Sequence, residues 1–457
     1  MDTLRVLVGV GLPWLLGVVW LRYRWSRAPE GGWALVLGYG FFIGILATTL
    51  LLRLLDALGL PLSFWLTGTM LAVLTGIGLW LTRSTPWRGW GGGRIGWENR
   101  VDRGLFVALA SVLLLHYACL GLELTFRPLD AWDAWATWAP KARVWFELRK
   151  LVPFVDWSTW LERGPGEAYT TAAYYYPPIV PLTQTWMSLA LGRWDDSLMS
   201  FPWLGCAVAL GLGLYGQARV WGVTPLPALV AVYLLLSLPL VNTHVALAGN
   251  ADLWLAAVYG LSAMAFFQWC RTRDRRQGLL ALGLAVGCSQ VKTPGLVWML
   301  TFVPALVVDR IRISRALVAL AGLLVLGLFL LRVAGPAASA LPHVGDVEIA
   351  FHPEAIGAVL ESYFSLATWH LFWYLWVAGF FLSMPLLLEQ RLFRTITALV
   401  ATDFVFLGVV YGFTSFAEFA VDFTQLNRAT LHIVPMLTFA ALVSVDASVR
   451  ARETGPS

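Results

Sequence analysis

The sequence predicts an all-α polytopic membrane protein with about 13 transmembrane helices. Of its 457 residues, 58% are hydrophobic and only 13% are charged, and the mean hydropathy is +0.70. Soluble globular domains are about one quarter charged, so this composition excludes that class. Apolar runs of about 20 residues, the length that crosses a bilayer as a helix, recur along the chain. Short arginine-rich segments separate many of these runs, as loops between membrane helices do.

The apolar runs that are candidates for these helices can be placed by residue number. They lie near residues 4–21, 33–52, 62–81, 105–122, 199–218, 226–243, 251–269, 279–291, 294–308, 316–334, 364–388, 395–413 and 429–446. No small-residue cleavage site follows the first run, so it is interpreted as a retained helix rather than a signal peptide. A further run at 177–192 is short and rich in proline, which favours a half-membrane or surface helix.

The basic residues predict the orientation of the spans. Arginine and lysine concentrate in cytoplasmic loops, and here the arginines gather in alternate loops, at residues 22–27, 83–103, 271–276, 310–315, 391–394 and 450–452. Residues 335–363 and 414–426 contain no lysine or arginine, as expected of outer segments. The alternation also places residues 123–176 outside, as a long loop bearing juxtamembrane helices.

Two domains and a membrane environment are expected from the remaining patterns. The glycine-rich residues 89–96 predict a flexible cytoplasmic connection, so residues 1–104 are expected to form a three-helix N-terminal extension and residues 105–457 the membrane core. No basic face suited to DNA or RNA is present in the pattern, which excludes a nucleic acid as partner. The four cysteines lack paired spacing and are interpreted as packing residues. Membrane lipids are the expected surroundings.

Residues 129–150 carry an unusual density of charge for a segment beside a membrane. On a helix, Asp130 and Asp133 share one face, and Lys141 follows Asp133 by two four-residue steps. A carboxylate in a partly dry pocket can act as a general base, whereas two carboxylates could instead hold a divalent cation. The alternative is a solvated pair that caps the helix. Lys141 and Arg143 could bind an anion or snorkel toward lipid headgroups.

Three more basic side chains are candidates for anion binding at the outer face. Lys292, one of only three lysines, lies in a turn between two apolar runs, and Arg428 and His432 are one helical turn apart at the outer end of the last run. Ionisable residues at that depth usually face a cavity, so we expect these side chains to bind the phosphate of a lipid carrier. Snorkelling to lipid headgroups is the alternative for Lys292.

Aromatic and acidic residues complete the set of candidates. Tyr175 and Tyr176 directly precede Pro177 and Pro178, and their rings could stack on a sugar or anchor the segment in the membrane interface. Asp252 begins an apolar run at the outer face. It is either a helix N-terminal carboxylate stabilised by the helix dipole or a second acid of the pocket.

The order of these motifs resembles that in the membrane-embedded glycosyltransferases of the GT-C superfamily, which includes the protein O-mannosyltransferases and the aminoarabinose transferases of lipid A. The resemblance covers roughly residues 105–446. It consists of an acidic pair in the first long outer loop, Asp130 and Asp133, followed by Lys141-Ala142, Tyr176-Pro177-Pro178, Gly249-Asn250-Ala251-Asp252-Leu253, Lys292-Thr293-Pro294-Gly295 and the late segment from Arg428 to Pro435. The chain departs from the family where two residues separate the acidic pair and where Tyr176 replaces a lysine.

The resemblance implies an inverting glycosyltransferase of the bacterial inner membrane, with residues 105–457 as its GT-C-like catalytic core and the active site on the periplasmic side. The donor would be a sugar linked to polyprenyl phosphate, and the acceptor a lipid, a glycan or a protein. A loop aspartate, Asp133 or Asp130, would be the base, and basic side chains would bind the lipid phosphate. Metal dependence differs across the superfamily, so the metal stays unknown.

Two other classes of protein also fit a chain with many spans and few charges. One is a transporter or flippase for a lipid-linked or polar solute, although such proteins tend to place their charges near the bilayer midplane and in paired halves. The other is a surface-polysaccharide ligase or polymerase, for which outer-loop arginines rather than an early aspartate pair are expected.

Overall fold

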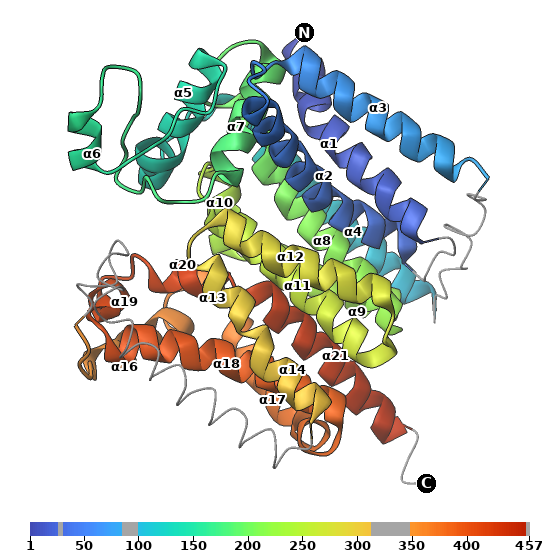
Figure 1. Cartoon of the computed structure of the whole chain (residues 1–457). Helices are drawn as coiled ribbons and strands as arrows, with labels where there is room; N and C mark the ends of the chain where they lie inside the picture. The colour runs from blue at the N-terminus through green and yellow to red at the C-terminus, as the bar shows by residue number, and fades with distance from the viewer. Residues whose placement is uncertain (26–30, 85–98, 312–347, 454–457) are drawn as a thin grey trace.

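The computed structural model describes residues 1–25, 31–84, 99–311 and 348–453, which fold as an all-α membrane protein (Figure 1). In this part of the chain eight helices are long and apolar enough to cross a membrane. They are α1 (Asp2–Arg24), α2 (Gly32–Ala57), α3 (Phe64–Thr82), α4 (Arg100–Phe126), the continuous pair η2 (Leu198–Ser200) and α8 (Phe201–Trp221), α11 (Asp252–Thr272), α18 (Arg391–Phe413) and α21 (Val434–Glu453).

The other apolar helices are shorter than each of these eight. They are α7 (Ile179–Leu191), α9 (Pro225–Leu236), α10 (Pro239–Ala246), α12 (Arg275–Val291), α13 (Gly295–Leu300), α14 (Phe302–Arg310) and α17 (Phe372–Glu389). α9 and α10 meet at 62° and make a ninth span if they are taken as one bent helix. The expected 13 spans therefore exceed the eight or nine among the described residues, because turns and prolines divide several apolar runs. The run predicted at 316–334 lies outside the described residues.

The connecting helices gather at one end of the bundle, which we call the loop end. It carries α5 (Ala139–Leu148) and α6 (Trp157–Glu162) together with α19 (Glu418–Val421) and α20 (Leu426–Leu431), all on the left of Figure 1. α16 (Glu354–Phe364) and the single turns η3 (Ala367–Trp369) and η4 (Ser415–Ala417) complete the connections. The last turn of α21 lies at the opposite end. The described parts of the segments that the arginine pattern predicts to be outer thus lie together, away from that turn.

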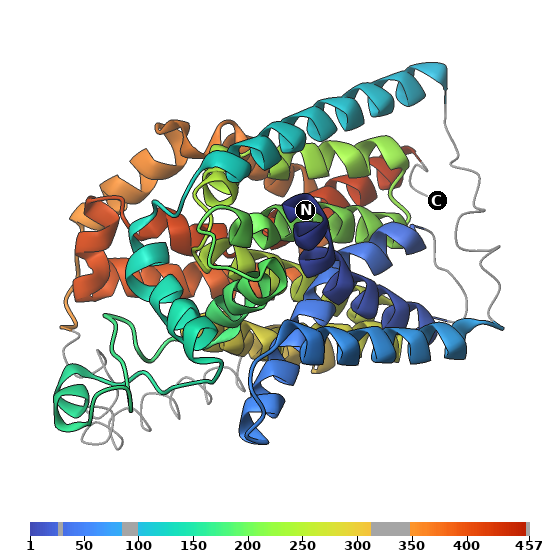
Figure 2. The same cartoon turned by 90° about the horizontal axis from the view of Figure 1, so that it is seen from above.

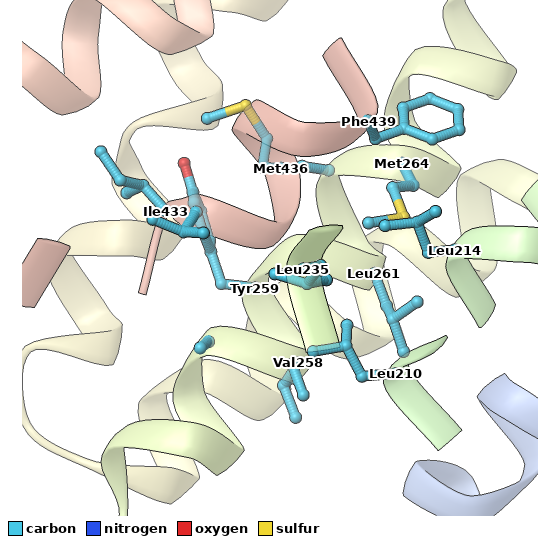
Figure 3. Close-up of a cluster of buried hydrophobic side chains, with 14 of the residues drawn as sticks. Leu210, Leu214, Leu235, Val258, Tyr259, Leu261, Met264, Ile433, Met436 and Phe439 are labelled. Atoms are coloured by element: carbon cyan, nitrogen blue, oxygen red, sulfur yellow. The ribbon is translucent and has the colours of Figure 1, made fainter. Parts of the chain in front are cut away.

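The helix α11 forms the centre of the bundle, with 94% of its most apolar window buried. Figure 3 shows its side chains packed among those of α8, α9 and α21. The labelled residues of this cluster are Leu210, Leu214, Leu235, Val258, Tyr259, Leu261, Met264, Ile433, Met436 and Phe439. By contrast, α3 and α4 lie on opposite edges of the bundle in Figure 2 and expose most of their apolar side chains, as lipid-facing helices do. Other helices therefore surround α11 over most of its length.

Close glycine contacts join the N-terminal helices to the rest of the bundle. A Cβ atom added to Gly44 of α2 would lie 1.8 Å from the carbonyl oxygen of Pro13 in α1, and one added to Gly38 would lie 2.2 Å from the backbone nitrogen of Gly213 in α8. Small residues of this kind let membrane helices approach closely. The domain boundary predicted at residue 104 stays a prediction, and α2 packs directly on α8 of the predicted core.

α7 begins and ends at the loop end of the bundle. Its 13 residues span about 20 Å, less than the roughly 30 Å of a bilayer core, and all of them are buried. Its C-terminal end meets the start of α1, where Arg5 donates to the Leu191 carbonyl and Arg193 pairs with Asp2 at 3.0 Å. Two candidate spans, α8 and α11, and the bent α9–α10 pair then connect α7 to the arginines near residue 271.

Candidate functional site

Asp252, the first residue of α11, is the centre of a group of charged side chains at the loop end. Its carboxylate is fully buried and accepts hydrogen bonds from three side chains. The donors are Lys292 Nζ at 2.7 Å, His432 Nε2 at 3.0 Å, and Arg428 through Nε at 2.8 Å and a terminal nitrogen at 2.6 Å. The N-terminus of α11 adds the positive end of the helix dipole. We call Asp133, Asp252, Lys292, Arg428 and His432 the charged cluster.

A glycine turn brings the start of α11 against the segment that contains Asp133. Gly249 has φ +105°, a conformation that other residues rarely adopt, and a Cβ atom there would lie 2.6 Å from the Cβ of Ala134. Ala134 begins the short π-helix η1 (Ala134–Trp138), which directly follows Asp133. The turn therefore holds Asp133 and Asp252 close enough to share one partner.

That shared partner is Arg428 of α20. Its guanidinium contacts the carboxylates of both Asp133 and Asp252. The charge of Asp252, assisted by that of Asp133, raises the pKa of Arg428 above its ordinary value. The Asp133 side chain is 32% exposed whereas that of Asp252 is 0% exposed, so Asp133 forms the open edge of the cluster.

His432 is held as a neutral imidazole with a defined tautomer. The indole Nε1 of Trp298 can only donate, and it donates to His432 Nδ1 at 3.0 Å. Nε2 therefore carries the hydrogen that bonds to Asp252. Burial lowers the pKa of His432, which also favours the neutral ring. His432 thus orients Asp252, and it is Lys292 and Arg428 that supply the positive charge.

Lys292 reaches the cluster because the chain turns tightly between α12 and α13. A Cβ atom on Gly295 would lie 1.9 Å from the Cys288 carbonyl oxygen, so only glycine permits this approach. The Lys292 side chain is 12% exposed and its ammonium pairs with Asp252. Lys292 and Arg428 could bind an anion here, and their role as phosphate ligands stays a prediction.

His244 of α10 faces the same carboxylate. Its Nδ1 lies 2.8 Å from the Leu240 carbonyl and therefore carries a hydrogen, and its Nε2 lies 4.0 Å from Asp252. That Nε2 atom is buried and makes no hydrogen bond within the described residues. Sequence reasoning missed His244 because the bend between α9 and α10 is what turns it toward Asp252.

Lys141 lies outside the charged cluster and holds the tyrosine segment in place. Its ammonium is buried and donates to the carbonyl oxygens of Ala173 at 3.0 Å, Tyr174 at 2.8 Å and Tyr176 at 3.2 Å. Burial lowers the pKa of Lys141 to about 8. Anion binding and snorkelling to lipid headgroups were the two roles predicted for Lys141 from the sequence, and in the structure its ammonium donates to backbone carbonyls instead.

The other predicted residues divide between the cluster and the surface. The ring of Tyr176 stacks on Trp138 at 5.1 Å, and burial raises its pKa with further contributions from Tyr175 and the two cluster carboxylates. Tyr175 packs edge-on against Tyr176, with ring centroids 5.0 Å apart. Arg143 is exposed, with its guanidinium 5.8 Å from the Trp194 ring. Asp130 is exposed and makes no hydrogen bond or ion pair with the five residues of the charged cluster.

The cluster is electrically balanced, with two carboxylates facing one lysine and one arginine. Among the described residues no group of three or more His, Cys, Asp or Glu side chains is arranged to hold a metal ion. Arg428 occupies the position between the carboxylates where a shared cation would bind. The divalent cation considered from sequence stays untested. Another anion with one negative charge can take the place of the Asp133 carboxylate on Arg428, and the two cations then stay neutralised.

Comparisons of the chain with protein-family models, with curated proteins and with solved structures find no match. The fold and the composition define the class as a polytopic all-α membrane protein.

Proposed function

We propose that the protein is an inverting glycosyltransferase that transfers a sugar from a polyprenyl-phosphate donor to an acceptor at the outer face of the bacterial inner membrane. One observation supports this most: Arg428 joins a partly exposed carboxylate to a fully buried one at the loop end. The ordered motifs that resemble the GT-C superfamily contribute the buried acid, both cations and the exposed acid.

The charge balance suggests how the donor would bind. A sugar-phosphate-polyprenol carries a phosphodiester with one negative charge, equal to the charge of Asp133. The phosphodiester would replace Asp133 on Arg428 and add a bond from Lys292, while Asp252 keeps both cations in position. Asp252 itself is an anion, so in this proposal it positions the phosphate ligands rather than touching the phosphate.

The displaced Asp133 would then act as general base. Released from Arg428, its carboxylate can accept the proton of an acceptor hydroxyl as the oxygen attacks the anomeric carbon. The carbon–oxygen bond to the phosphate breaks on the opposite face, and the polyprenyl phosphate leaves with the electron pair, which Lys292 and Arg428 stabilise. The stereochemistry inverts because attack and departure occur on opposite faces.

Transfer from radiolabelled polyprenyl-phosphate sugars by purified protein tests the proposal. Asp133→Asn should abolish transfer, and Asp130→Asn, a matched change at the exposed acid of the same segment, should leave it within a few-fold of wild type. Lys292→Ala and Arg428→Lys should raise the KM for donor, whereas Lys150→Ala should not. Transfer by a folded Asp133→Asn variant at the wild-type rate would remove the general base from this proposal.

The sidedness of the site needs a separate test. In a chain carrying Cys119→Ala, a cysteine at Ser158 of the exposed helix α6 should react with a membrane-impermeant thiol reagent added from the periplasm. The other three cysteines are buried and give a low background. Reaction only from the cytoplasm would place the charged cluster on the wrong side for a polyprenyl-linked donor.

A transporter or flippase is the second candidate, supported by a buried acid, Asp403, within α18 and by the broken helices around the centre of the bundle. Intramembrane acids and interrupted helices are common in transporters. Proteoliposomes distinguish the two functions: a flippase moves a lipid-linked sugar across the bilayer without cleaving it, and Asp133→Asn should not stop that movement.

A further inference from the structure

The middle of the bundle contains a buried acid that the charged cluster does not use. Asp403 lies near the middle of α18 and is fully buried. Within the described ranges of the chain no lysine, arginine or histidine forms an ion pair with it. An unpaired ionised carboxylate at this depth would be very costly, so its surroundings must compensate in another way.

Within the described part of the chain, two hydroxyl groups lie next to Asp403. The Tyr259 hydroxyl of α11 lies 2.7 and 2.8 Å from the two Asp403 oxygens, and it lies 2.8 Å from Thr301 Oγ1 at the junction of α13 and α14. Thr301 in turn donates to the backbone carbonyl of Trp298 at 2.8 Å. Figure 3 shows the Tyr259 hydroxyl pointing away from the labelled leucines.

Counting hydrogens assigns a direction to this chain of contacts. Each hydroxyl has one hydrogen, and that of Thr301 is used on the Trp298 carbonyl, which can only accept. The contact between Tyr259 and Thr301 therefore uses the tyrosine hydrogen. The remaining contact, between Tyr259 and Asp403, has a hydrogen only if the carboxyl group of Asp403 is protonated. An ionised Asp403 would leave one of the three contacts without a hydrogen.

We propose that Asp403 is a proton-binding site within the membrane and that its neutral carboxyl group is the first donor of a hydrogen-bond relay. The relay runs from Asp403 to Tyr259, then to Thr301 and to the carbonyl of Trp298. The indole of Trp298 donates to His432, so the relay ends on the residue that fixes the tautomer beside Asp252. This assignment holds whether or not the protein transfers sugars.

Infrared spectroscopy of the purified protein in nanodiscs at neutral pH tests the proton on Asp403. The wild-type spectrum should contain a carboxylic-acid C=O stretch that shifts in D2O and that is absent from the spectrum of Asp403→Asn. The carboxylate bands should be the same in both proteins. Asp446→Asn is the control, because Asp446 pairs with Arg450 at 3.0 Å and should lose carboxylate bands instead. Loss of carboxylate bands from Asp403→Asn would overturn the proposal.

A second variant tests the relay and remains informative if Asp403→Asn does not fold. Tyr259→Phe removes the acceptor of the Asp403 proton, so the same C=O stretch should move to higher frequency as its hydrogen bond is lost. The band should keep its intensity, because the proton remains on the carboxyl group. A C=O stretch that is absent from wild type, or that Tyr259→Phe leaves unshifted, would show that Asp403 does not donate to Tyr259.

Discussion

Replacing Lys141 by methionine separates a structural role of this lysine from phosphate binding. Methionine keeps most of the apolar stem but removes the three hydrogen bonds to the carbonyls of Ala173, Tyr174 and Tyr176. The Ala173 carbonyl keeps a second donor, the Tyr176 amide at 3.1 Å. The carbonyls of Tyr174 and Tyr176 lose the donor that the lysine supplies.

The expected cost follows from these contacts. Two partly buried carbonyls without a donor cost roughly 2–6 kcal/mol together, and the weakened bond at Ala173 adds about 1 kcal/mol. Methionine also avoids burying the ammonium, whose cost is about 3.4 kcal/mol because burial lowers the Lys141 pKa from 10.5 to about 8. Lys141→Met should therefore lower the stability of the tyrosine segment by about 2 kcal/mol. This corresponds to a change of roughly 30-fold in the equilibrium constant for opening the segment.

Hydrogen exchange measured by mass spectrometry reads this loss directly. In the protein without substrate, Lys141→Met should speed exchange about 30-fold at the bonded amides of residues 169–176, where opening no longer breaks the lysine bonds. Lys150→Met, at the exposed lysine of the same segment, should change exchange little. Exchange within threefold of wild type, combined with a raised KM for donor, would refute the structural role and restore Lys141 as a phosphate ligand.

Three further predictions concern packing, charge and pH. Gly44→Ala should destabilise the bundle by more than about 1–3 kcal/mol, because the added Cβ would meet the Pro13 carbonyl. Gly76→Ala should not destabilise it, because the space around Gly76 is open. Thermal unfolding, followed by thiol labelling of the buried cysteines, measures the stability of both variants. Asp252→Asn should cost about 3–5 kcal/mol in the same assay, since it leaves buried cations without their counter-charge, and a wild-type melting temperature would contradict this. Between about pH 8 and pH 10.5 the unfolded chain binds the Lys141 proton more than the folded protein does, so wild type should gain stability relative to Lys141→Met as the pH rises. A constant difference in melting temperature over that interval would contradict the lowered pKa.

The sequence was sufficient to select the residues of the charged cluster one at a time. Asp133 is notable in the charge-dense residues 129–150, and the other four are ionisable side chains at or near the end of an apolar run. The five meet at the loop end because each lies at or near a helix terminus. Their pairing depends on tertiary contacts between distant residues, since Lys292 and Asp252 are 40 residues apart and Asp133 and Arg428 are 295 apart. No local pattern could give those pairs.

The positions of Asp130 and Lys141 show why the sequence does not place every candidate residue in the charged cluster. A single α-helix was assumed for residues 129–150, which puts Asp133 and Lys141 on one face. The π-helix η1 lies between them, and its wider turn shifts the register of every residue that follows. The partners of Lys141 are backbone carbonyls, whose positions in a loop leave no signature in the side-chain pattern.

The protein buries acids by two different means, and the difference predicts opposite outcomes for one chemical change. Asp252 is surrounded by Lys292, Arg428 and His432, so its negative charge is required, and replacement by asparagine leaves the cations unbalanced. Among the described residues Asp403 hydrogen-bonds to a hydroxyl group and forms no ion pair, so in the proposed protonated state asparagine supplies an equivalent donor to Tyr259. Asp252→Asn should therefore be strongly destabilising and Asp403→Asn mild. The charged cluster, whose charges balance, can exchange an anion with solvent. A neutral Asp403 at the centre of the bundle carries no negative charge that would repel this anion.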